Sequence, residues 1–160
     1  MSDAEIESTV EAALARELPD VDLREVRVLA GREPMVRVVV DRAAGVDHGL
    51  CVDVTRALEA EGLRERHGIE VSSPGPEPPL RTTEHFRAVL GGRISLRLEE
   101  DGSRPRDRTA TLLAVSGEIL SVRFGDAGDP IDVPIHSVRR ARSLANDHAP
   151  LAGARGGVTA

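Results

Sequence analysis

Two adjacent serines near the middle of the chain are the first candidates for nucleophilic chemistry. Ser72 and Ser73 end the alternating run 68–71 and are followed by Pro74 and Gly75. A catalytic Gly-x-Ser-x-Gly turn needs glycines on both sides of its serine, and this segment does not have that spacing. Turn residues usually serve the turn, so we expect both hydroxyls to bind local backbone amides and Gly75 to adopt a positive φ. A small α/β hydrolase that uses Ser72 and Ser73 is the alternative interpretation.

Asp47, His48 and Cys51 bring three possible metal ligands close together. A zinc site needs a further ligand pair at a suitable spacing, but the other histidines are scattered. These are His67, His85, His136 and His148. No carboxylate and nucleophile can be placed beside His67 or His136 from the sequence. We therefore interpret Asp47 as a helix cap and Cys51 as a buried thiol, and we expect a protein without a metal, a cofactor or enzymatic activity.

Charge is divided unevenly along the 160 residues. Residues 1–80 contain 9 Arg and 17 Asp plus Glu, a balance of −8, whereas residues 81–160 contain 12 Arg and 10 Asp plus Glu, a balance of +2; the two give the net charge of −6. An acidic surface favours basic proteins, and an arginine-bearing surface can approach phosphate. Phe86 and Phe124 are the only aromatic residues. Base stacking is therefore disfavoured, and contacts to phosphate and protein are the expected kind.

Arginines of the second half form the candidate binding surface. Arg93 and Arg97 are predicted to lie on the same side of one strand, and Arg123 on the outward face of another. The expected binding residues are Arg81, Arg93, Arg97, Arg123, Arg139 and Arg140, with Arg142 beside them. An ordinary solvated surface balanced by acidic residues 99–101 is an equal alternative.

The first half is predicted to fold as helix, strand, strand, helix, strand. Ser2 and Glu5 have the spacing of a capping box at the start of the first helix. Strands are predicted at 21–30, 35–41 and 67–72, with a second helix at 49–61. This order predicts a small sheet with both helices packed on one of its faces.

The second half is predicted to be a separate small domain. Proline at four of the positions 74–79 excludes a helix or a central strand there. A short helix capped by Thr82 or Thr83 should run to Leu90, and four or five strands should then curl into a small barrel. The predicted organisation is an N-terminal α/β domain at 1–75, a proline-rich linker at 76–81, a C-terminal small β-barrel at 82–145 and a disordered tail at 146–160.

A single cysteine excludes an intrachain disulfide, and no segment approaches the roughly 18 apolar residues of a membrane span. The N-terminus is acidic and helical, unlike a signal peptide. We therefore expect a monomeric cytoplasmic protein that does not bind a membrane.

The central motif gives the chain a resemblance to a known family. Glu70-Val71-Ser72-Ser73-Pro74-Gly75, then Pro79-Leu80, then Phe86 and Gly91 leading into a strand, resemble the bacterial ribosome maturation factor RimP family, and Gly45-Val46 and Cys51 fit it too. The resemblance covers about residues 3–145. It implies an α+β protein with an N-terminal domain of KH-like topology and a C-terminal Sm-like or SH3-like small β-barrel.

The resemblance also implies a function in assembly of the small (30S) ribosomal subunit. Members bind free small subunits near the decoding-centre ribosomal protein and adjacent rRNA, which would make these the partners of the candidate arginines. The chain departs from the family where Pro76-Glu77-Pro78-Pro79-Leu80 replaces a motif with a basic residue, and its N-terminal half has no Gly-x-x-Gly loop for clamping nucleic acid. We interpret the segment with Glu70, Ser72, Ser73, Pro74, Gly75, Pro79 and Leu80 as a stiff joint between the domains.

Overall fold

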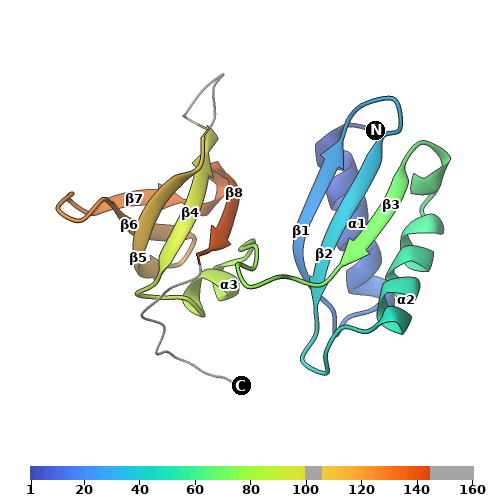
Figure 1. Ribbon diagram of the computed structural model, residues 1–160, viewed down its shortest axis with the longest axis horizontal. Helices are drawn as coiled ribbons and strands as arrows, with labels where there is room; N and C mark the ends of the chain where they lie inside the picture. The colour runs from blue at the N-terminus through green and yellow to red at the C-terminus, as the bar shows by residue number, and fades with distance from the viewer. Residues whose placement is uncertain (100–105, 145–160) are drawn as a thin grey trace. The chain divides into compact units, whose positions relative to one another are not determined.

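The computed structural model describes residues 1–99 and 106–144 (Figure 1). These residues form three α-helices and two β-sheets, which confirms the predicted α+β class. The chain folds as two compact units, Met1–Gly75 and a second that begins at Pro76. The predicted tail at 146–160 lies outside the described residues. None of the described helices is long and apolar enough to cross a membrane.

The first unit contains the predicted order of helices and strands. Its elements are α1 (Asp3–Glu17), β1 (Asp22–Leu29), β2 (Met35–Asp41), α2 (His48–Glu59), the 3-10 turn η1 (Leu63–Glu65) and β3 (Gly68–Ser72). The strand order is β1-β2-β3, with β1 antiparallel and β3 parallel to β2. The parallel pair follows from the crossover through α2.

Side-chain alternation on β2 explains why both helices cover the same face of this sheet. Val36, Val38 and Val40 are fully buried and share one face. They form one core with the apolar stripes of the two helices, Ile6, Val10, Ala13 and Leu14 from α1 and Leu50, Val54 and Leu58 from α2. At the start of α1, a hydrogen bond donated by the backbone N–H of Ser2 lowers the pKa of the Glu5 carboxyl, as the capping box predicts.

The second unit is a short helix with an antiparallel sheet. Its elements are α3 (Thr83–Arg87), β4 (Arg93–Leu98), β5 (Arg108–Ser116), β6 (Ile119–Phe124), β7 (Ile131–Pro134), the 3-10 turn η3 (Ile135–Ser137) and β8 (Val138–Ser143). The strand order is β7-β6-β5-β4-β8. Because β7 and β8 are the outer strands and do not pair with each other in the described residues, the prediction of a closed barrel is not confirmed.

Strand β8 was not predicted from the sequence. Its only apolar residues, Val138 and Ala141, are three positions apart, which does not match the two-residue period of a regular strand. The pairing with β4 shifts register between Arg97 and Leu98, so that Val138 and Ala141 both face the core. A bulge of this kind hides a strand from periodicity analysis.

The core of the second unit is built on β4 and α3. Ile94, Leu96 and Leu98 are at most 1% exposed and alternate with Arg93, Ser95 and Arg97 of the opposite face, where Ser95 is also buried, at 7% exposed. Phe86 of α3 is the largest side chain buried among them. Leu80, which precedes α3, is 5% exposed and belongs to the same core.

Candidate functional site

Strand β4 directs two of the candidate arginines to the outside of the second sheet. Because Ile94, Leu96 and Leu98 point into the core, Arg93 and Arg97 must point to the opposite face. Residues paired directly across neighbouring strands share a face, so the strand register shows which side chains lie beside them.

Three rows cross this outward face. In the first, Arg93 pairs with Thr111, which pairs with Arg123 of β6. In the second, Ser95 pairs with Thr109 on one side and with Arg142 of β8 on the other, and in the third Arg97 pairs with Arg140. We call the resulting set the arginine face: Arg93, Arg97, Arg123, Arg140 and Arg142.

Several members of the arginine face are held in position by oxygen atoms. Arg97 Nε lies 2.9 Å from Asp107 Oδ1, and Arg123 Nε donates to the Gly128 carbonyl at 3.1 Å. Arg142 Nε lies 3.9 Å from Glu77 Oε1. Arg93 is exposed and makes no ion pair within residues 1–99 and 106–144. Arg97 and Arg140 lie opposite each other across β4 and β8, so this row places two guanidinium groups side by side.

The segment before α3 extends this face. The Leu80 N–H donates to the Ala141 carbonyl at 2.9 Å, the Ser143 N–H donates to the Pro78 carbonyl at 2.9 Å, and Pro79 forms a bridge with Arg142. Arg81 follows directly, and its N–H donates to His85 Nδ1 at 2.9 Å and not to β8. Residues 78–80, predicted to lie in a linker, therefore run along the outer edge of β8.

Arg139 differs from the other candidates. It is exposed but falls in the register shift between β4 and β8, so it has no partner position on β4. The structure thus brings together Arg93, Arg97, Arg123, Arg140 and Arg142. Neither Arg81 nor Arg139 has a paired position in these rows.

The central serine motif is built differently from the sequence prediction. Ser72 and Ser73 are exposed, and neither hydroxyl makes a hydrogen bond to any described residue. The prediction that they bind local backbone amides is therefore wrong for this part of the chain. The predicted positive φ at Gly75 is also wrong, since Gly75 is not among the glycines with positive φ. A residue before proline, here Pro76, favours extended backbone. Glu70 projects from the sheet face opposite the core and forms an ion pair with Arg37.

Replacing Gly75 with alanine should therefore leave the free energy of unfolding within about 0.5 kcal/mol of the original. The new Cβ would meet no atom within 4 Å, and φ needs no glycine. Gly117 in the β5–β6 turn is the matched contrast, since its φ of 60° should make alanine cost about 1–2 kcal/mol. Urea denaturation of the two variants tests this, and equal destabilisation would show that Gly75, like Gly117, needs a conformation reserved for glycine.

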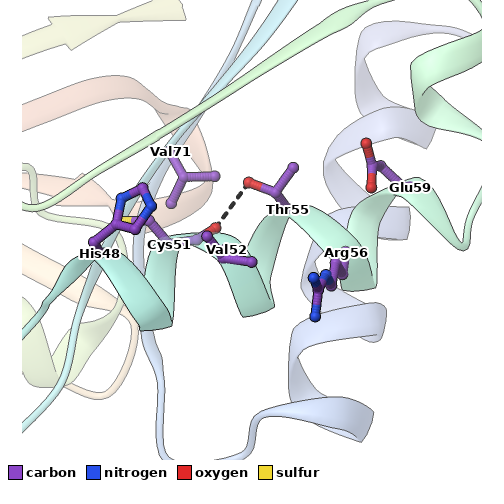
Figure 2. A pocket seen from close by; sticks show the side chains of 7 residues that line it. All are labelled: His48, Cys51, Val52, Thr55, Arg56, Glu59 and Val71. Atoms are coloured by element: carbon purple, nitrogen blue, oxygen red, sulfur yellow. Dashed lines mark hydrogen bonds between the residues drawn. The ribbon is translucent and has the colours of Figure 1, made fainter.

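The three clustered possible metal ligands lie at the start of α2. Asp47 caps the helix, accepting from the Leu50 N–H at 2.8 Å, as predicted. Cys51 is half-buried, not buried as predicted, and His48 is exposed. Figure 2 shows both side chains near Val71. In the described residues, no group of three or more His, Cys, Asp or Glu side chains is placed to hold a metal ion.

His85 is a structural residue that sequence reasoning overlooked. It is only 5% exposed, and its Nδ1 accepts from the N–H groups of Arg81 at 2.9 Å and Thr82 at 3.1 Å. In return, the Thr82 hydroxyl accepts from the His85 N–H at 3.2 Å. His85 thus takes the position that Glu or Gln holds in a capping box, three residues after Thr82. That three-residue spacing is the sequence signal from which its capping role could have been predicted.

The fold and the site define an α+β protein of two small units, one of which has an arginine-bearing sheet face. A scan of the chain against protein-family models finds no match.

Proposed function

We propose that this protein is a noncatalytic maturation factor of the RimP type, which acts in the cytoplasm as a monomer and assists assembly of the small ribosomal subunit. It would bind free small subunits near the decoding-centre ribosomal protein and adjacent rRNA. The first unit would correspond to the KH-like domain and the second to the Sm-like domain of that family. The observation that carries the proposal is the arginine face, together with the central motif that resembles the family.

The arginine face suits a phosphate backbone better than bases. Its rows contain arginine, threonine and serine, whereas the aromatic side chains that stack on bases are absent from them. Phe86 is buried, and Phe124 lies under the guanidinium of Arg108, 3.9 Å from it, so neither is presented on this face. Arginine binds phosphate oxygens through paired N–H groups, which recognises the position and shape of the rRNA backbone.

The acidic first unit would then face a different component of the subunit. Residues 1–75 contain 9 Arg and 16 Asp plus Glu, a net charge of −7. Such a surface is repelled by rRNA and attracted to the basic ribosomal protein beside it. The division of charge between the units would thus orient the factor on a site composed of both.

Reversing charge on the arginine face should weaken binding to free small subunits by roughly tenfold or more and should lower the salt dependence of binding. We suggest the double variant Arg93→Glu, Arg142→Glu, because both side chains are exposed. Each lost phosphate contact should reduce the slope of log K against log salt by about 0.7–0.9. Sedimentation of the variant with purified small subunits at several salt concentrations measures both effects.

The matched control is Arg32→Glu, Arg66→Glu, which changes the net charge equally at exposed positions of the first unit. If the control loses as much affinity as the arginine-face variant, long-range charge and not this face governs binding. Equal binding of the unmodified protein to free small subunits and complete ribosomes would contradict a role in maturation.

A further inference from the structure

The two sheets differ in how their outer edges are protected. An exposed strand edge offers unpaired N–H and C=O groups to other chains, and proteins usually block it with a bulge, a proline, a short strand or a covering segment. Strand β1 has a register shift between Leu23 and Glu25, β8 is covered by residues 78–80, and β7 has four residues and ends at Pro134. β3 has five residues, contains no proline and has a regular register with β2, and no segment of the described residues pairs with its other edge.

The backbone of β3 shows which groups are available at this edge. The Gly68 N–H donates to the Pro34 carbonyl at 2.8 Å on the β2 side. Successive residues of a strand direct their N–H and C=O groups to opposite edges, so Gly68, Glu70 and Ser72 face β2. Ile69 and Val71 therefore direct their N–H and C=O groups away from β2, and no backbone of Met1–Gly75 pairs with them.

A groove lies beside this edge, between β3 and α2 (Figure 2). Its volume is about 240 Å³, and its lining is His48, Cys51, Val52, Thr55, Arg56, Glu59 and Val71. Figure 2 shows Cys51, Val52 and Val71 together toward one end and Glu59 toward the other. The volume is below the roughly 300–1,000 Å³ of small-molecule sites, so it fits side chains better than a whole ligand.

We propose that the free edge of β3 binds an extended basic segment of a partner protein, which adds to the sheet as a fourth strand beside α2. The N–H and C=O groups of Ile69 and Val71 would pair with its backbone, and alternate apolar side chains would enter the groove. Arg56 and Glu59 balance each other in the groove lining, so the net charge of −7 on residues 1–75 is what favours a basic segment. The same charge disfavours pairing between two copies of β3, because it would bring two acidic units together.

This site is separate from the arginine face, so its test needs no ribosomal particle. We suggest titrating the full-length ¹⁵N-labelled protein with an acetylated and amidated ten-residue peptide of alternating Lys and Val. We expect binding tighter than about 1 mM, which corresponds to about −4 kcal/mol. Amide hydrogen exchange at Ile69 and Val71 should slow by at least about fivefold when the peptide is saturating.

Two control peptides define what is recognised. A peptide with Glu in place of Lys should bind at least about tenfold more weakly, since it is repelled by the acidic unit. A peptide with Pro in place of every second Val should also bind at least about tenfold more weakly, because it cannot form the strand ladder. Equal binding of the proline peptide would overturn the proposal, as would unchanged exchange at Ile69 and Val71 or no binding at about 1 mM.

Variants of the protein test the edge at Val71, which also lines the groove, and the groove alone at Thr55. Val71→Pro removes an N–H that does not serve the β2 ladder and should weaken binding about tenfold, whereas Val71→Thr retains the N–H and should bind within about twofold. Thr55→Trp fills the groove from α2 and should also weaken peptide binding about tenfold. This variant tests the proposal even if Val71→Pro does not fold. A fall in the exchange rates of Ile69 and Val71 as protein concentration rises, in the absence of peptide, would identify a second copy of the chain as the occupant. That result would overturn the proposal.

Discussion

Replacing Leu80 with alanine should lower the free energy of unfolding of the second unit by about 2–5 kcal/mol. Leu80 is 5% exposed and packs in the same core as Phe86, Ile94 and Leu96. Its N–H also donates to the Ala141 carbonyl at 2.9 Å, which fixes the segment along β8. Truncation would leave a cavity where this segment meets the core, and a small domain has little stability to lose.

Leu90→Ala is the matched control for this prediction. Leu90 is 49% exposed, so the same chemical change should cost less than about 1 kcal/mol there. Because the chain contains no Trp or Tyr, unfolding is best followed by NMR signals of the two units during urea denaturation. The signals of Val36 and Val38 in the first core should keep their midpoint. If Leu80→Ala costs no more than Leu90→Ala, residues 78–80 act as a linker and not as part of the second unit.

Elements with regular periodicity could be predicted from the sequence. The capping box at Ser2, the alternation of Val36, Val38 and Val40, and the alternation of Ile94, Leu96 and Leu98 are local patterns, and each has the structure that it predicts. The outward direction of Arg93 and Arg97 follows from the same alternation. The interpretation of the central motif as an interdomain joint stays a prediction.

Features that depend on pairing between distant segments could not be predicted. Pro79 lies opposite Arg142, a neighbour 63 positions away, and no local property of a proline-rich run indicates that partner. The shift between Arg97 and Leu98 conceals β8, and without β8 the neighbours Arg140 and Arg142 of the arginine face could not be assigned. Proline density indicates where regular structure stops, but the backbone groups of such a run can still pair along an edge strand.

Replacing His85 should destabilise the second unit by about 2–4 kcal/mol, unless the new side chain can accept hydrogen bonds. Nδ1 of this buried imidazole is the acceptor for the N–H groups of Arg81 and Thr82, and both groups would lose it. Unpaired buried donors retain their desolvation cost, so the loss should exceed that of an exposed cap. The effect should be observed in the second unit, where Phe86 of the same helix is in the core.

Glutamine and leucine at position 85 separate the acceptor from the packing. Glutamine is a usual residue at this position of a capping box, and its side-chain carbonyl can accept from the backbone N–H of Thr82, so His85→Gln should recover about half of the loss or more. Leucine fills similar space without an acceptor, so His85→Leu should be nearly as unstable as His85→Ala. Thr82→Ala removes the reciprocal bond alone and should cost about 1 kcal/mol. Equal stability of the glutamine and leucine variants in urea denaturation would show that His85 stabilises the unit by packing alone. The N-cap residue Thr82 lies two residues after Leu80, so a loss of this cap should also weaken the pairing of residues 78–80 with β8. Amide exchange at Leu80 would detect that change.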